Sequence, residues 1–228
     1  MIELQRRDHD LIDLTYEQQF VSVGHAQKYV FGSMQPRRQR ERILELERAG
    51  VIRREECLVS QVGRIIRLTK SGVQIAESRR SEIIPQQRKL DLRTLQHDAL
   101  VTAVRLRLSQ LWDAHWIPER LIKAEQFRHI PDGVAVFESG TQIAIEVENS
   151  PKGPKRFREI QERWRGVPVK LCLYVASQAV MHRIVLSYLK DGPQDLPFAL
   201  VSWDELATGT PKVWSVFGEL DLFSRRAY

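Results

Sequence analysis

The chain of 228 residues is 43% hydrophobic and 28% charged, which is ordinary for a soluble globular protein and allows two small domains or one large one. No apolar run approaches the roughly 18 residues of a membrane span, and residues 1–7 lack the apolar core of a signal peptide, so we expect a cytoplasmic protein with no membrane partner. The net charge of +6 favours an anionic partner, and the two cysteines, Cys57 and Cys172, have no spacing that indicates a zinc site or a disulfide framework.

Three helices are predicted first. The apolar spacing predicts one over residues 8–18 and a second over 21–31, which Gly32 and Ser33 end. A third runs from Pro36, which suits a first helical turn, to about Ala49, where Gly50 stops it. Ser33 or Gln35 is the candidate N-cap of this third helix.

A hairpin and a fourth helix follow. Residues 51–54 and 63–68 are short and alternate in polarity, which predicts two strands around a polar loop. Thr69 is a plausible N-cap for a helix that continues to about Arg80.

Positive charge gathers in the third helix and the strand after it. Residues 37–54 hold seven arginines against three glutamates. Arginine suits bidentate contacts to phosphates and guanine edges. Composition alone leaves a second interpretation open, a solvated helix face whose arginines pair with glutamates one turn away.

Helix, helix, arginine-rich helix, hairpin and helix is the order of a winged helix-turn-helix domain. The chain also resembles that family in its motifs, Leu-x-x-x-Gly-x-Ile from Leu46 to Ile52 and Leu-Thr-x-x-Gly from Leu68 to Gly72. The resemblance implies binding of double-stranded DNA, although an interaction or dimerisation module is the alternative. The cations that would contact DNA are Arg37, Arg38, Arg40, Arg42, Arg53, Arg54, Arg64 and Lys70.

A polar stretch, residues 81–90, is predicted to link this domain of residues 1–80 to a second domain of residues 91–228. The second domain opens with a long amphipathic helix and continues with strands and helices, which predicts a mixed sheet flanked by helices. Its predicted elements are a helix at 91–113, strands at 133–137 and 141–148 joined by a tight hairpin, a charged helix at 154–165, a strand at 169–175, a helix at 180–189 and a strand at 198–202.

Carboxylates mark the first hairpin of the second domain. Asp132 precedes one strand, and Glu146 and Glu148 share one face at the end of the next, within an apolar sequence. Such carboxylates repel one another unless a cation lies between them, and their oxygen ligands favour Mg²⁺ or Mn²⁺. The alternative is a solvent-facing side of an edge strand, with the glutamates paired to nearby lysine or arginine.

This pattern resembles the PD-(D/E)XK core of restriction-endonuclease-like proteins, which implies that Asp132 and Glu146 hold a metal ion. Glu148 occupies the position where that family carries lysine. Either Lys152 or Lys155 replaces the lysine, or the site is inactive.

The run from His129 to Phe157 resembles more narrowly the MobC-type plasmid mobilisation relaxases and related replication-relaxation proteins, which pair a winged helix with a nuclease-like domain. The matching residues are His129, Pro131, Asp132, Gly133, Glu146, Glu148, Lys152, Arg156 and Phe157. Trp116, with Glu119 and Arg120, resembles the segment before the first strand in those proteins, and His97 matches a helical histidine.

The resemblance implies metal-dependent nicking of DNA at a plasmid or mobile-element origin, with Asp132 and Glu146 on the metal and Glu148 on the metal or acting as base. It also implies that Lys152 polarises the attacked phosphate and that His129 orients Asp132 or acts as acid or base. Neither Tyr174, within a strand, nor Tyr228, at the end of the chain, is a convincing nucleophile, so we expect water to attack.

Two other functions stay open. One is a non-catalytic regulator that binds an operator and whose nuclease-like domain is degenerate. The other is an adaptor that contacts other relaxosome proteins. A homodimer is compatible with each function, but no heptad pattern indicates one.

Overall fold

The computed structural model describes residues 2–57, 59, 61–86, 89–122, 128–193, 195–209 and 211–223. Contacts divide the chain into two compact units, residues 1–103 and 104–228, and the division falls within α5 (Leu95–Leu111). The sequence places a linker at residues 81–90, of which Gln87 and Arg88 lie outside the described residues, and that boundary stays a prediction.

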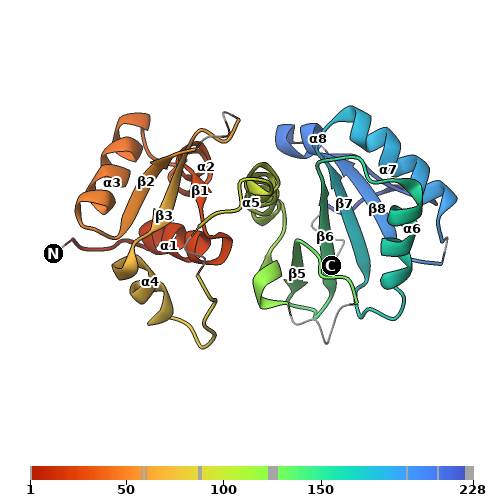
Figure 1. Ribbon diagram of the computed structural model, residues 1–228, viewed down its shortest axis with the longest axis horizontal. Coiled ribbons are helices and arrows are strands. Elements are labelled where there is room, and N and C mark those ends of the chain that lie inside the picture. Colours follow the sequence, from red (N-terminus) through yellow and green to blue (C-terminus); the bar gives the residue numbers. More distant parts are fainter. Residues whose placement is uncertain are drawn as a thin grey trace. The chain divides into compact units, whose positions relative to one another are not determined.

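The first unit combines helices with a small antiparallel sheet, which has three strands in the order β1-β3-β2 within the described ranges (Figure 1). Its elements before α5 are α1 (Arg6–Gln18), β1 (Val21–Ser22), α2 (Val23–His25), the π-helical turn η1 (Ala26–Val30), α3 (Pro36–Arg48), β2 (Ile52–Glu56), β3 (Arg64–Leu68) and α4 (Lys70–Glu77).

The start of the second predicted helix is wrong, because the chain is extended there. Val21 pairs with Ile66 and Ser22 with Ile65, which makes β1 the third strand of the small sheet. The Ser22 side chain then accepts a hydrogen bond from the His25 backbone amide at 3.1 Å and caps α2. A strand of two residues is too short to show a periodic pattern. The apolar spacing of residues 21–31 therefore placed the predicted start of the helix too early in the chain.

Caps and stops define the helices on either side of the hairpin. Pro36 occupies the first turn of α3, while the Gln35 side chain makes no capping bond. Gly50, which follows α3, has a φ of 69°, a conformation that glycine adopts without steric cost. The Thr69 hydroxyl accepts a hydrogen bond from the Gly72 amide at 3.2 Å, which confirms Thr69 as the N-cap of α4.

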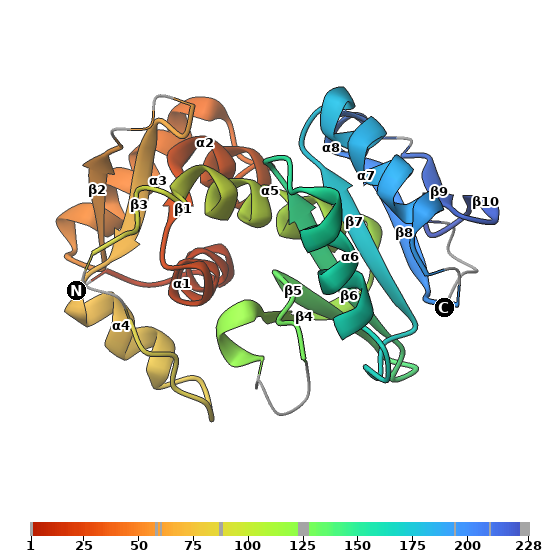
Figure 2. The same ribbon diagram turned by 45° about the vertical axis from the view of Figure 1, so that its right-hand side comes forward.

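The second unit is built on a mixed sheet of seven strands in its described part, in the order β10-β9-β8-β7-β6-β5-β4 (Figure 2). Its elements after α5 are β4 (Ala114–Pro118), the 3-10 turn η2 (Glu119–Leu121), β5 (Gly133–Phe137), β6 (Gln142–Glu148), α6 (Pro154–Arg163), β7 (Leu171–Ala176), α7 (Ala179–Asp191), β8 (Phe198–Ser202), α8 (Trp203–Thr208), β9 (Val213–Ser215) and β10 (Gly218–Leu220). The sequence analysis predicted no element at β4, α8, β9 or β10.

The centre of this sheet is parallel and the flanks are antiparallel. β6 pairs in parallel with β7, and β7 with β8, while β4 and β5 pair antiparallel on one side and β9 and β10 on the other. Every residue of β7 is buried, as expected for a central strand covered on both faces. The fold is therefore a mixed sheet flanked by helices, as predicted.

One face of this sheet is covered by α6 and α7, which lie side by side (Figure 1). The core there joins strand residues Ala144, Tyr174 and Leu200 to Phe157 of α6 and Val185 of α7. The side chains of alternate strand residues point to the opposite face.

On that opposite face, Phe137 packs edge-on against the Trp112 ring, with ring centroids 5.5 Å apart. The Trp112 indole also donates a hydrogen bond to the carbonyl of Leu222 at 2.8 Å, which holds the chain beyond β10. In the part of the chain that the structure describes, no helix combines the length and the apolar character needed to cross a membrane.

Candidate functional site

Glu146 and Glu148 lie on the face of β6 that α6 and α7 cover. They stand opposite Tyr174 and Ala176 of β7, both of which belong to the core on that face. β6 is an interior strand, and the two glutamate side chains are only 8% and 3% exposed. The solvent-facing edge strand of the alternative is therefore wrong, but the pairing with a nearby lysine that it included is present between Glu148 and Lys152.

Asp132 is held beside the same strand by a backbone amide. Its Oδ2 accepts a hydrogen bond from the N–H of Val147 at 2.7 Å, so the carboxylate that precedes β5 reaches the end of β6. The close approach of neighbouring strands depends on Gly133, because a Cβ there would lie 2.1 Å from Cζ2 of Trp116 in β4. The Asp-Gly pair thus gives one carboxylate to the site and lets an indole ring pack behind it.

His129 contacts Glu146. The imidazole Nε2 lies 2.9 Å from Oε1 of Glu146, although the alignment is not that of a hydrogen bond, and neither atom has a hydrogen-bond partner among the described residues. Burial raises the pKa of Glu146 to about 7, the negative charge of Asp132 adds to the increase, and His129 and Lys152 oppose it. Glu146 is therefore a buried carboxyl that changes its charge near neutral pH.

Lys152 contacts Glu148. Its Nζ pairs with Oε1 of Glu148, and its carbonyl accepts a hydrogen bond from the Tyr188 hydroxyl at 3.1 Å. The structure thus brings together the predicted site residues Asp132, Glu146, Glu148, Lys152 and His129, with the His129 imidazole against Glu146.

Three carboxylates supply the hard oxygen donors that Mg²⁺ and Mn²⁺ prefer, and Oε1 of Glu146, which has no hydrogen bond within the described residues, is the atom that fits a cation. Asp132 accepts a hydrogen bond from the Val147 amide, Glu148 pairs with Lys152, and Glu146 has the His129 imidazole beside it. As the described side chains stand, no group of three or more His, Cys, Asp or Glu residues is arranged to hold a metal ion. A bound metal ion would therefore have to displace His129 from Glu146 and Lys152 from Glu148.

His129 also lines a basic pocket of about 570 Å³. From the sequence, Lys155 is a candidate for the missing lysine and Arg156 is a match to the relaxases, but neither predicts a pocket. The signal that could have indicated a pocket is the recurrence of cations along one side of α6. The lining residues are His129, Gly153, Lys155, Arg156, Glu159, Ile160 and Arg163.

In the first unit, the arginines at the start of α3 are open to solvent. The side chains of Arg37 and Arg38 are 87% and 74% exposed, and both contact Glu41. Arg40 is also exposed and donates a hydrogen bond from Nε to the carbonyl of Pro36 at 3.2 Å. The pairing with Glu41 is the kind expected of a solvated helix face, yet these guanidinium groups stay accessible.

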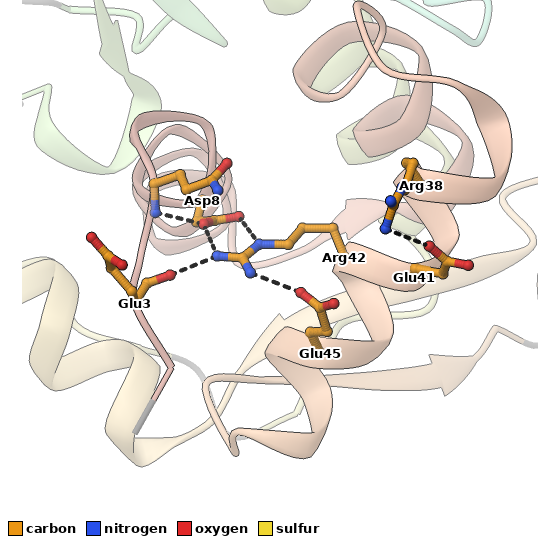
Figure 3. A network of polar contacts seen from close by, with 7 residues as sticks. Glu3, Asp8, Arg38, Glu41, Arg42 and Glu45 are labelled. Carbon is orange, nitrogen blue, oxygen red and sulfur yellow. Dashed lines mark hydrogen bonds and ion pairs between the residues drawn. The ribbon is translucent and has the colours of Figure 1, made fainter.

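Arg42 lies differently, because its guanidinium is drawn toward α1 (Figure 3). It donates to both carboxylate oxygens of Asp8, whose side chain is fully buried, and to Glu45 and the carbonyl of Glu3. The hydrogen bond to Asp8 is the main reason that the pKa of Arg42 is raised. With a side chain only 13% exposed, Arg42 joins α1 to α3 and is poorly placed to contact DNA. No pattern in the sequence indicates Asp8 as its partner.

The cations predicted around the hairpin are mostly paired. Arg53 contacts Glu55, Arg54 holds Glu47 through Nε and Nη2, and Arg64 contacts Glu56. Arg53 and Arg64 are half exposed, whereas Arg54 is only 23% exposed. Lys70, at the start of α4, is exposed.

Tyr174, one of the tyrosines examined as a nucleophile, is completely buried between β6 and β8. Tyr228 lies outside the described residues. No family model, curated protein or solved structure matches this chain.

Proposed function

We propose that this protein binds double-stranded DNA through its first unit and hydrolyses a DNA phosphodiester at the carboxylates of its second unit, as a nickase of a plasmid or mobile-element origin. The observation that carries the proposal is the juxtaposition of a buried carboxylate cluster with a basic pocket across one histidine, His129. Phosphodiester hydrolysis needs both kinds of group, because carboxylates bind the metal ion and cations bind the phosphate oxygens.

The element order of the first unit supports the DNA-binding half. A helix, a short strand, three helical segments (α2, η1 and α3), a two-stranded hairpin and a closing helix follow one another, with β1 completing the small sheet. This is the order that the resemblance to winged helix domains implies, and in that family the helix before the hairpin enters the major groove. Arg37, Arg38 and Arg40 are then the cations available to contact DNA, in addition to exposed Lys70 and half-exposed Arg53 and Arg64.

The second unit supports the nuclease half by the position of its acids. Asp132 precedes β5, and Glu146 and Glu148 end β6, as the resemblance to the PD-(D/E)XK core implies. A bound Mg²⁺ or Mn²⁺ would supply an activated water and offset phosphate charge. Lys152 presents its ammonium beside Glu148, so it is the candidate for the missing lysine. His129, between the acids and the pocket, is placed to move a proton at Glu146.

One observation favours a second candidate, a DNA-binding regulator without catalytic activity. His129 and Lys152 already occupy the two glutamates. A degenerate nuclease fold would keep such pairs because they neutralise buried carboxylates after the metal site has been lost.

Nicking of supercoiled plasmid separates the two candidates. The plasmid carries the DNA that surrounds the gene and is incubated with the full chain and Mg²⁺ or Mn²⁺. We expect the wild-type protein and the control Glu138→Gln, in the exposed hairpin after β5, to convert it to open circles. Asp132→Asn and Glu146→Gln should not do so. Sequence-specific binding without open circles would support the regulator and contradict the nickase.

A salt titration of duplex binding tests the first unit. Each lost phosphate contact should lower the slope of log K against log salt by about 0.9. We expect Arg38→Ala/Arg40→Ala to reduce that slope, whereas Arg48→Ala, an exposed arginine at the other end of α3, should leave it nearly unchanged. No duplex binding at low salt would contradict the DNA-binding half.

A further inference from the structure

The charged side chains of α6 and of the turn after it differ in whether they form ion pairs and in whether they line the basic pocket. Arg165, just beyond the helix, pairs with Glu162 and Asp195. Lys155, Arg156 and Arg163 make no ion pair within the part of the chain that the structure describes, and all three line the basic pocket. The pocket therefore holds cations that the fold does not neutralise, against a single carboxylate, Glu159.

Most arginines around the hairpin of the first unit, by contrast, are paired with glutamates. The three unpaired pocket cations of α6 lie on neighbouring turns and repel one another, which costs free energy. A bound anion would reduce that repulsion. The pocket opens to solvent, because the side chains of Lys155, Arg156, Glu159 and Arg163 are exposed. The first turn of α6, after Gly153, adds the positive end of a helix dipole.

We propose that this pocket binds the sugar-phosphate backbone of one DNA strand and brings one of its phosphates to His129, next to the buried carboxylates. The proposal rests on the proposed function, since it identifies how the strand would be held at that site. The ligand chemistry is the phosphate oxyanion, which arginine binds through two parallel hydrogen bonds.

Size favours a strand over an isolated phosphate. Lys155 and Arg163 are separated by eight residues of helix, about 12 Å along the axis at 1.5 Å per residue. One phosphate does not bridge that spacing, but successive phosphates of a strand do. The volume of about 570 Å³ is likewise that of a pocket for a ligand larger than a single ion.

His129 connects the pocket to the buried carboxylates. It lines the pocket and its Nε2 lies 2.9 Å from Oε1 of Glu146, so it separates the bound backbone from the carboxylates by one imidazole ring. A phosphate at this wall would meet the cations from one side and the metal ligands of the proposed nickase from the other.

Binding of a single-stranded oligonucleotide tests the pocket. The probe is a fluorescent 12-nucleotide DNA, the chelator EDTA prevents cleavage, and the full chain carries Arg38→Ala/Arg40→Ala so that the first unit contributes little. We expect Lys155→Ala/Arg163→Ala to weaken binding about tenfold and to reduce the salt slope by about 1.4, or 0.7 for each phosphate contact.

Arg158 provides the matched control, because it is an exposed arginine of the same helix that does not line the pocket. Arg158→Ala should change the affinity less than twofold. Equal losses for the control and the pocket variant, or no loss for the pocket variant, would overturn the proposal.

Glu159 allows a test with the opposite sign, which a folding defect would not mimic. Glu159→Gln removes the negative charge from the pocket, so it should strengthen binding about threefold, whereas Glu138→Gln, on the distant hairpin loop, should have no effect. Unchanged or weaker binding by Glu159→Gln would count against a phosphate ligand.

Competition distinguishes a strand from a free phosphate. An oligonucleotide with a neutral methylphosphonate backbone should not compete with the probe, and inorganic phosphate should compete only at millimolar concentration. Displacement by micromolar inorganic phosphate would overturn the proposal in favour of a free-phosphate site. Oligonucleotide binding is measured without metal and without the α3 arginines Arg38 and Arg40. A negative result in the nicking assay or in duplex binding therefore does not affect this test of the pocket.

Discussion

Nε2 of His129 lies 2.9 Å from Oε1 of Glu146, and this contact joins the two chemically different sides of the second unit. On one side Glu146 is enclosed between β5 and β7 beneath α6, where burial raises its pKa to about 7. On the other side His129 lines the basic pocket. His129 is therefore the side chain that joins the buried carboxyl to the solvent-facing pocket.

The first prediction concerns stability and pH. A carboxyl whose pKa is raised by folding stabilises the fold fully below its ordinary pKa of 4.5, and that contribution is lost as the pH rises through about 7. Glu146→Gln removes the buried charge at high pH. In urea unfolding with chelator, the variant should be more stable than wild type at pH 8.5 by on the order of 2–3 kcal/mol, and equal to it at pH 4.

Glu138→Gln is the control for this series, because Glu138 is exposed and its substitution should shift the stability little at any pH. A Glu146→Gln variant that is less stable than wild type at pH 8.5 would show that charged Glu146 is stabilised by its partners more than it is penalised by burial.

The second prediction separates a structural arginine from surface arginines of the same helix. Arg42→Ala leaves the fully buried Asp8 without its cation, with only the Gln5 amide still donating to the carboxylate, and should reduce the free energy of unfolding by about 3–5 kcal/mol. Arg48→Ala, at the exposed end of α3, should cost less than about 0.5 kcal/mol. Thermal unfolding followed by circular dichroism checks both. Similar melting temperatures for the two variants would mean that the pair between Asp8 and Arg42 contributes little.

The third prediction concerns the Asp-Gly pair that begins β5. Gly133→Ala places a methyl group 2.1 Å from Cζ2 of the buried Trp116 ring, so it should destabilise the protein by about 2–3 kcal/mol. If that contact is the cause, Gly133→Ala combined with Trp116→Leu should cost less than the sum of the two single changes. Strict additivity in the denaturant midpoints would place the strain elsewhere.

Local periodicity predicted much of the fold. The apolar runs of β5, β6 and β7 need only neighbouring residues to be identified, and each lies close to its predicted range. The two-residue β1 and the short β9 and β10 were missed, because such strands are defined by partners distant in sequence. The ends of α5 also lie inside the predicted range of 91–113.

The candidate site divides in the same way. The shared face of Glu146 and Glu148 follows from the two-residue period of a strand. The contact of His129 with Glu146 depends on how the chain before β5 approaches β6, and the pairing of Asp8 with Arg42 spans 34 residues. No local pattern encodes such distances, so these partners could only come from the structure.

The last prediction tests whether Lys152 and a metal ion compete for Glu148. The Glu148 side chain is 3% exposed, so Lys152→Met leaves a buried carboxylate without its cation and should lower the metal-free stability by about 2 kcal/mol. Lys155→Met removes an exposed lysine that contacts no carboxylate within the described residues, and it should have almost no effect.

The Lys152→Met substitution should have the opposite effect on Mn²⁺ binding. The ion no longer has to displace an ammonium from Glu148, so the Lys152→Met variant should bind Mn²⁺ roughly tenfold more tightly than wild type, equivalent to about 1.4 kcal/mol. Calorimetric titration measures this directly. Because the ammonium of Lys152 is also the candidate to polarise the attacked phosphate, tighter metal binding should be accompanied by loss of nicking. Unchanged Mn²⁺ affinity would mean that Glu148 is not a metal ligand, and that its pair with Lys152 serves only to neutralise a buried charge.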